Sequence, residues 1–459
     1  MRVGLFVRAV LLAELSFPIA VASAQAPEAD ASAATTPPAA RTTLADCVRR
    51  ALAQNPSLRG AAAVRDEATA ERRSARGRFG PVVRVEANVM RWDSPFAIPL
   101  PLSVPGVDVP PFPVRDATTA QVSATVIQPL TGLWTVYEGH RAQQLGEEAA
   151  RHQQRATTHD VVLAVVDAYF QALEAERMSG LAQVQVESIE AHVERARRLQ
   201  ERELISPNDV LAAEVRLADA RAQMLQARGG ARLARANLAF QIGLPANEEV
   251  WPAAISLSDS RARATRARPD PDAAQQRPEL AMARARVEQA RAGVRVATSQ
   301  MLPQVNALAG VQHVEGVYFQ PQTAWFVGAQ LTWNVWEWGS SYYAIDAARA
   351  RARQAEAAEA RAREALTLEA TQAEIDGDTA RAQLGVARAA VSQAERNLAS
   401  VERRFEQQVS TSTDVLDAQA LLHAARVREA RSEYGVLRAE ARLRRARGLD
   451  PIATPGGSR

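Results

Sequence analysis

The stretch 302–338 most constrains the fold, because apolar and polar residues alternate in two successive segments. Apolar residues stand at every second position from Val305 to Val311 and from Trp325 to Trp333, and amides and threonine lie among the residues between them. Such a period places apolar groups on one face of a strand and amides on the other. About ten residues is the length that a tilted strand needs to cross a bilayer core. The pattern therefore suits a strand pair between lipid and water, and a hairpin on a soluble core is the alternative.

Residues 1–24 have the pattern of a secretory signal peptide. Arg2 and Arg8 supply positive charge, an apolar run follows, and Ala22-Ser23-Ala24 fits a small-residue cleavage site. The Ala-, Pro- and Thr-rich residues 25–41 predict a disordered linker. No later stretch has the roughly 18 to 20 uninterrupted apolar residues of a membrane helix, so we expect export without a helical anchor.

The composition excludes several functions. All 55 basic residues are arginine, which rules out a Walker-type phosphate loop and a Schiff-base or kinase lysine. The six histidines include no metal-like i, i+4 pair. With 52 acids the net charge is +3, and the arginines alternate with Glu and Ala, which indicates solvated helix faces rather than a nucleic-acid patch. We find no catalytic constellation and no cofactor or metal site, so we do not expect an enzyme.

Cys47 is the only cysteine, which excludes an intrachain disulfide. The preceding Leu44-Ala45-Asp46 faintly resembles a bacterial lipid-attachment box. However, Asp46 stands where a small residue is needed, and the cysteine lies far beyond the signal. Lipidation of Cys47 is therefore not expected.

The residue pattern in the first half of the mature chain predicts three helices and two strands. The helices cover about 44–76, 138–203 and 209–242, and the strands cover about 81–92 and 120–130. Seven prolines crowd residues 95–113 and predict that neither a ladder nor a helix forms there. Leu204-Ile205-Ser206-Pro207-Asn208 breaks the long helix from the next one.

The pattern is then repeated. Pro56 and Pro81 match Pro278 and Pro303 at one common offset, and Asp209-Val210-Leu211 matches Asp414-Val415-Leu416. One unit, helix–strand–loop–strand–long helix–turn–helix, is therefore written twice. We predict a first repeat over 42–245, a connector over 246–276, a second repeat over 277–449 with strands over about 302–312 and 324–335, and a tail over 450–459.

The helix lengths and seams predict the architecture. In each repeat the two short helices laid end to end match the long one, at roughly 100 Å for 1.5 Å per residue. Small and apolar residues step by four and three from Ala213 to Leu238 and from Leu416 to Ala441, which is typical of left-handed coiled coils. We therefore predict a mainly α protein with a small β part.

The strands require neighbours. Four strands cannot close a membrane barrel, and open edges are not tolerated in lipid. Three chains would supply twelve strands. Most tryptophans fall in or beside the predicted strands, as in the aromatic girdles of outer-membrane barrels, and the candidates for the membrane interface are Trp92, Trp325, Trp333, Trp336 and Trp338.

Over residues 42–449 the chain resembles the TolC-like outer-membrane efflux proteins. The resemblance is carried by Leu44 to Leu58, the junctions at Pro81 and Leu302-Pro303, the strand exits Gln128-Pro129-Leu130 and Trp336 to Gly339, and the segments Ser206 to Leu211 and Ser412 to Ala418. It implies a homotrimer with a twelve-stranded barrel in the outer membrane of a Gram-negative bacterium and an α-helical coiled-coil tunnel in the periplasm. It further implies a passive exit duct for drugs, metal ions or proteins, opened when a periplasmic adaptor and an inner-membrane pump, proton-driven or ABC-type, dock on it.

The two helix–helix turns farthest from the strands should meet at the periplasmic tip. The residues expected to contact the adaptor there are Leu204, Ile205, Ser206, Pro207, Val409, Ser410 and Ser412. The resemblance implies a cation-selective constriction at Asp414 and Asp417, with Asp209 at the equivalent place in the first repeat. Local stabilisation of a helix start, with Ser412 or Thr413 as its cap, is the alternative role of these acids.

The turn over residues 409–413 lacks the glycine and the arginine often seen in relatives, so the resemblance does not imply a charge-pair latch at this tip. A periplasmic or surface coiled-coil scaffold or adhesin without a pore is the alternative function of the whole chain. It would explain the heptads and the linker, but not the paired alternating strands in both repeats.

Overall fold

The computed structural model describes residues 41–99, 110–245, 247–255 and 277–449. The predicted signal peptide and tail, nearly all of the linker and most of the connector lie outside these residues. All of the described helices and strands belong to one compact unit.

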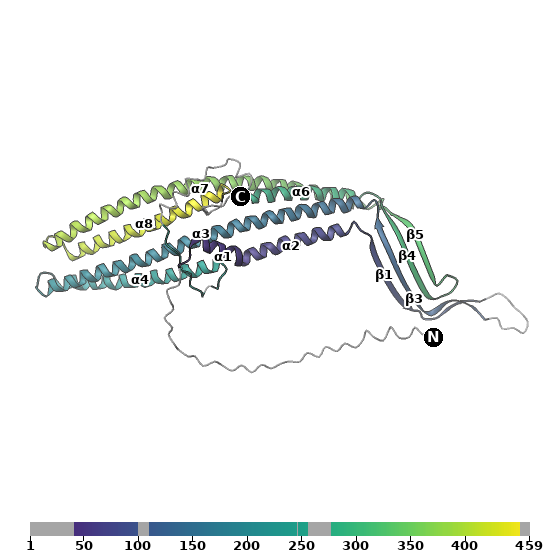
Figure 1. Cartoon of the computed structure of the whole chain (residues 1–459), viewed down its shortest axis with the longest axis horizontal. Coiled ribbons are helices and arrows are strands. Elements are labelled where there is room, and N and C mark those ends of the chain that lie inside the picture. Colours follow the sequence, from purple (N-terminus) through teal and green to yellow (C-terminus); the bar gives the residue numbers. More distant parts are fainter. Residues whose placement is uncertain (1–40, 100–109, 246, 256–276, 450–459) are drawn as a thin grey trace, which may run out of the picture. The chain divides into compact units, whose positions relative to one another are not determined.

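The unit is mainly helical. Its helices are α1 (Leu44–Gln54), α2 (Pro56–Gly77), α3 (Leu133–Gln200) and α4 (Pro207–Gln241) in the first repeat, and α6 (Pro278–Ser299), α7 (Ser340–Glu406) and α8 (Ser412–Ala446) in the second. α3 and α7 have 68 and 67 residues, which at 1.5 Å per residue makes each about 100 Å long. α4 packs along α3, and α8 packs along α7 (Figure 1).

The strands form one antiparallel sheet. They are β1 (Val82–Arg91), β2 (Phe96–Ile98), β3 (Phe112–Pro129), β4 (Gln304–Val317) and β5 (Thr323–Thr332). The order is β1-β3-β4-β5, and β2 pairs with β3. The β3–β4 pair, with Val126 opposite Ala309, therefore joins the two repeats in one sheet. β1 and β5 form its edges, and all of their residues are exposed.

The predicted single helix over 44–76 is wrong, because the chain breaks between α1 and α2. Pro56 begins α2, and Asn55 before it has an extended backbone, with φ −63° and ψ 124°. The proline ring disfavours the helical region for the preceding residue. The Asn55 side chain instead accepts a hydrogen bond from the Ser57 amide at 2.8 Å and caps the new helix.

The proline-rich segment does contain a ladder, contrary to the prediction. β3 begins at Phe112 rather than near Ala120, and Pro113 is paired with Ala97 of β2. The register shifts between Phe96 and Ala97. A bulge of this kind tolerates proline because it already interrupts the ladder hydrogen bonds.

The strands of the second repeat also differ from their predicted ends. β4 continues to Val317, and β5 ends at Thr332, which pairs with the first residue of β4, Gln304. Beyond Thr332 the neighbouring strand offers no further partner. Trp333, which the prediction placed in the strand, therefore follows β5, as Trp336 and Trp338 do.

The predicted seam of α4 is confirmed, and that of α8 is wrong near its start. Ala213, Ala220 and Leu238 are buried on α4. On α8, however, Ala420 is exposed. The reason is that α8 packs against α3 as well as α7, so that one stripe does not describe its buried surface.

The largest core cluster surrounds Tyr169 of α3, which is fully buried. Its hydroxyl donates to the carbonyl of Ala253 at 2.6 Å and also lies 3.2 Å from the Thr42 carbonyl. Thr42 forms a parallel bridge with Pro252. The start of the described chain and the start of the connector are thus held together on the middle of α3.

The short helices meet end to end in the same way in both repeats. In the first, the Asn55 side-chain amide donates to the Gln241 carbonyl at the end of α4, at 2.8 Å. In the second, Arg277 precedes Pro278 and reaches the Ala446 carbonyl at the end of α8, at 3.5 Å. In both repeats the residue before a helix-starting proline therefore closes the joint.

Gly243 is part of the first joint and provides a test of its packing. Its φ is +85°, and a Cβ there would lie 2.9 Å from the backbone carbonyl of Gln54. We predict that Gly243→Ala destabilises the detergent-solubilised protein by about 1–3 kcal/mol through strain and this clash. Gly230→Ala is the control, because that glycine is helical and a Cβ added to it would meet no atom within 4 Å. We expect it to be neutral or stabilising by up to about 1 kcal/mol. Equal unfolding midpoints for the two variants would contradict a tight joint.

Candidate functional site

The two turns that lie farthest along the chain from the sheet are built alike. Glu203 and Gln408 both have φ +60°, and the following residues close the helix ends. The Leu204 amide donates to the Leu199 carbonyl, and the Val409 amide donates to the Arg404 carbonyl, each at 2.9 Å. This is a Schellman pattern with a non-glycine residue in the left-handed position. We therefore name residues 201–206 and 407–411 the first and second tip turns.

The helix that follows each tip turn starts with a capping box. In the first, Ser206 caps α4, and the Asp209 carboxylate accepts from the Ser206 amide at 3.2 Å. In the second, Thr411 caps α8, so the predicted caps Ser412 and Thr413 are wrong by one or two residues. Since the capping oxygen must precede the helical residues whose amides it binds, Thr411 has the right place and Ser412 is already helical.

The predicted constriction residues Asp414 and Asp417 have different surroundings. The Asp414 carboxylate accepts from the Thr411 amide and hydroxyl, both at 2.8 Å, and from the Ser410 hydroxyl at 3.0 Å. The Thr411 amide in particular holds the pKa of Asp414 below its usual range. Asp417 instead lies 3.8 Å from Arg216 of α4 and is exposed. Asp414 therefore stabilises the helix start and keeps its negative charge, while Asp417 faces the neighbouring repeat.

The structure brings the two tip turns together through α3 and α8. His192 Nε2 of α3 lies 2.7 Å from Ser412 Oγ, and both residues are buried. Leu416 packs into a cluster with Val186 and Val193. A cavity of about 350 Å³ lies beside this joint and is lined by residues from both turns, including Leu204 and Ser410.

Sequence reasoning did not single out His192. It occupies a seam position of α3 between Ile189 and Ala196, both buried. A polar residue at a position whose neighbours three and four residues away are apolar is the one signal that could have found it. Among the predicted adaptor contacts, Ser412 is only 3% exposed, whereas Val409 is 75% exposed.

A ladder of ion pairs fixes α8 on α3. Three arginines of α8 at steps of four and three meet three acids of α3 that are seven residues apart. The pairs are Arg438 with Glu174 at 2.8 Å, Arg442 with Asp167 at 3.0 Å, and Arg445 with Asp160. Because the numbers rise on one helix as they fall on the other, the helices are antiparallel. The ladder therefore lies along the contact between α8 and α3, the helix pair that also brings the two tip turns together.

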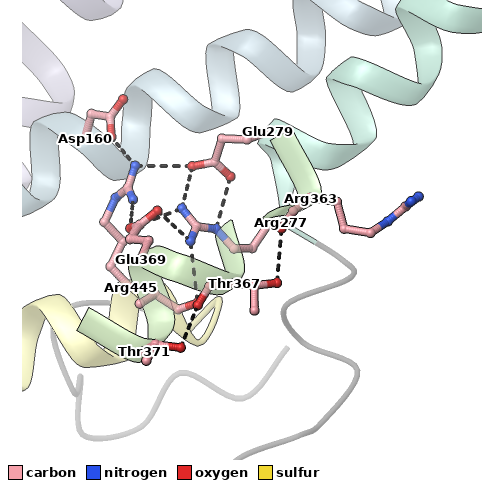
Figure 2. Close-up of polar contacts among 9 residues, drawn as sticks. Asp160, Arg277, Glu279, Arg363, Thr367, Glu369, Thr371 and Arg445 are labelled. Atoms are coloured by element: carbon pink, nitrogen blue, oxygen red, sulfur yellow. Dashed lines mark hydrogen bonds and ion pairs between the residues drawn. The ribbon is translucent and has the colours of Figure 1, made fainter. Parts of the chain in front are cut away.

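The ladder ends in a charge cluster at the second end-to-end joint (Figure 2). Arg277, whose side chain is 2% exposed, pairs with Glu279 at 2.9 Å and with Glu369 at 3.0 Å. Arg445 shares the same two carboxylates at 3.2 and 2.6 Å. The Arg277 guanidinium lowers the pKa of Glu279 against the opposing effect of burial. The cluster thus ties α6, α7 and α8 to α3.

The tryptophans predicted at a membrane interface are exposed around the sheet. Trp325 and Trp338 are 82% and 87% exposed, and the Trp336 and Trp338 rings lie 5.7 Å apart. Trp92 lies under the Arg115 guanidinium, 3.7 Å from its ring centroid. Exposed aromatic rings gathered in this way mark an interaction surface.

Within the described residues, no group of three or more His, Cys, Asp or Glu side chains could hold a metal ion. None of the helices described here is both long and apolar enough to cross a membrane.

These features define a chain with duplicated long helical hairpins, a shared antiparallel sheet and two joined tip turns. The chain belongs to the outer membrane efflux protein family, whose model matches residues 47–244 and 271–449.

Two solved structures have the same fold. The outer-membrane channel OprN is 21% identical, with a TM-score of 0.75 over 88% of this chain and 89% of that one. The outer membrane channel CmeC of Campylobacter jejuni is 17% identical, with a TM-score of 0.76 over 88% and 85% of the two chains.

Protein CyaE of Bordetella pertussis is 32% identical over 125 residues, and the match spans 27% of this chain and 26% of that relative.

We predict that Arg277→Met destabilises the protein by about 3 kcal/mol, because Glu279 and Glu369 then lose a buried partner. The control is Arg291→Met, which removes exposed pairs with Glu288 and Glu356 and should cost less than about 1 kcal/mol. Thermal and urea unfolding in detergent measure both changes. Equal losses would mean that the buried cluster contributes no more than a surface pair.

Proposed function

We propose that the chain is one subunit of a homotrimeric, passive exit duct in the outer membrane of a Gram-negative bacterium. The observation that carries the proposal is the open sheet, because β1 and β5 have exposed residues along their whole length and each has one unpaired edge. In lipid such edges must pair. If β5 of one copy pairs with β1 of the next, three copies supply twelve strands from β1, β3, β4 and β5 and close a barrel.

The helices support the same ring. α3 packs against α1, α2, α4, α6 and α8, whereas its repeat counterpart α7 packs against α6 and α8. α7 correspondingly leaves Leu368, Ile375 and Val386 at least 60% exposed. On the opposite side of the unit, α4 exposes Leu233 and Phe240 at 72% and 65%.

The exposed apolar residues of α7 and those of α4 form two different surfaces. They fit a head-to-tail contact in which α7 of one copy packs against α2 and α4 of the next. A head-to-tail contact of this kind closes into a ring when its rotation allows. In this arrangement β5 and α7, the edge strand and the long helix of the second repeat, both face the same neighbouring copy. That agreement between sheet and helices supports one closed assembly.

The tip turns supply the inner end of the duct. In a chain whose sheet lies in the outer membrane, helices of about 100 Å carry these turns far into the periplasm. Exposed apolar residues there, Leu204 at 47% and Val409 at 75%, suit docking of a periplasmic adaptor. Together with Ile205, Ser206, Pro207 and Ser410 they form the proposed adaptor contact. An inner-membrane pump, proton-driven or ABC-type, then delivers cargo into the tunnel.

The acids of the tip form the proposed constriction. Under threefold symmetry Asp414 and Asp417 become two rings of three carboxylates, and Asp209 adds charge at the matching turn. A narrow mouth focuses the field of such rings and favours cations. The cap hydrogen bonds favour the ionised form of Asp414. The same residue can therefore cap α8 and supply a negative charge to the proposed constriction.

We predict that native mass spectrometry in detergent finds a trimer. Leu368→Glu combined with Ile375→Glu should shift most of the protein to monomer, because charges would enter the proposed contact between copies. The conservative pair Leu368→Met and Ile375→Leu should keep the trimer. A wild-type monomer that retains β-structure would contradict the shared barrel.

We predict that Asp414→Asn with Asp417→Asn lowers cation preference in planar bilayers, moving the reversal potential in a salt gradient towards zero, most at low salt. Asparagine keeps an oxygen for the Thr411 amide, whereas alanine would also remove a cap worth about 1 kcal/mol. Asp219→Asn is the control, an exposed acid of α4 beyond the tip. Unchanged selectivity with an intact trimer would contradict the proposed constriction and leave only the structural role of Asp414 in capping α8.

A further inference from the structure

The joint between the two tip turns depends on one buried histidine. His192 is fully buried, and Ser412, in the first turn of α8, is 3% exposed. Nε2 of the imidazole lies 2.7 Å from the serine hydroxyl, while Nδ1 is buried without a partner. The ring also packs against Phe405 of α7, with centroids 5.5 Å apart. One side chain of α3 therefore contacts both helices that flank the second tip turn.

We propose that His192 makes this joint acid-sensitive, so that the neutral imidazole holds the start of α8 on α3 and the protonated imidazole releases it. A protonated ring would carry two N–H donors, and the buried Nδ1 has no acceptor. The ring is fully buried, and burying an unpaired charge is costly. Moving the start of α8 away from α3 is the change that exposes the ring.

The charged groups around the joint do not compensate that charge. Arg195 and Arg198 of α3 and Arg202 of the first tip turn line the adjacent cavity. Glu402 and Glu406 of α7 line it as well, but neither forms an ion pair with His192 in the described part of the chain. The acids at the helix starts have other partners, since Asp209 and Asp414 bind their own caps and Asp417 faces Arg216. Burial, and then the Arg195 charge, lower the pKa of His192 from 6.5 to about 4.

The direction of the effect follows from that shift. A histidine whose pKa is lower in the closed joint than when exposed favours the closed joint at neutral pH, and this advantage is lost as the pH falls below 6.5 towards 4. Between pH 7.5 and pH 5.5 the opening constant of the joint should rise about tenfold. If the chain is the proposed exit duct, the opening loosens its periplasmic end in acid. The joint itself can be tested without that assumption.

The test is hydrogen exchange of the full-length protein in detergent at pH 7.5 and 5.5, corrected for intrinsic exchange and followed in peptides that cover residues 408–418. We expect about tenfold faster opening at pH 5.5 in the wild type. His192→Gln should lose this acid response, because glutamine can bond to Ser412 but does not titrate. His423→Gln on α8 is the control and should keep the response, although burial lowers the pKa of His423 as well.

A second variant guards against a His192→Gln protein that fails to fold. Ser412→Ala leaves the imidazole in place and removes its partner, so we expect faster opening already at pH 7.5 with an acid response retained. An acid response that survives in His192→Gln, or a Ser412→Ala protein that opens like the wild type, would overturn the proposal. Loss of channel conductance in bilayers at both pH values, with these exchange results intact, would instead count against the proposed function.

Discussion

The structure depends on a duplicated unit that buries only part of its helix surface and pairs only part of its strand edges. Each repeat supplies a long helix, shorter helices and two principal strands, but α3 packs against helices of both repeats while the main neighbours of α7 are α6 and α8 of its own repeat. The same asymmetry is present in the sheet, where β3 and β4 are paired on both sides and β1 and β5 on one. The chain by itself therefore leaves part of α7 and one edge of each of β1 and β5 without cover, which is the surface that the proposed ring would bury.

The two halves of the unit are held by contacts of different physical kinds. Near the second end-to-end joint, arginines of α8 and acids of α3 form ion pairs, and Arg277 adds a buried member. At the tip the same two helices meet through apolar packing and the neutral His192–Ser412 pair. Charged pairs retain attraction as long as the carboxylates stay ionised, while a fully buried imidazole becomes an unpaired buried charge when it gains a proton. The distal contact is therefore the one that mild acid affects first.

The sequence predicted the parts of this fold that follow from periodicity. Alternation located the four principal strands, and the heptad steps and the break at Leu204–Asn208 gave the long helices and their turns. The prediction failed where a single residue interrupts the hydrophobic periodicity of a helix or strand. Asn55–Pro56 interrupts an otherwise helical pattern, and Pro113 enters a ladder at a bulge. The cap at Thr411 was missed although it stands three residues before Asp414, which is the spacing of a capping box. The partner of His192 depends on the contact between α3 and α8, which the periodicity of neither segment shows.

Asp414, one of the aspartates of the proposed constriction, also has a structural role. Asp414 is held by the amide and hydroxyl of Thr411, an arrangement that orders the helix start. Those hydrogen bonds do not neutralise the carboxylate, because the donors are uncharged and favour its ionised form. The capping box thus fixes the position of the Asp414 charge, so the proposed constriction would need no further contact to order this side chain. Asp417 has no such cap and lies near Arg216, so its contribution to a field depends on whether that guanidinium stays beside it.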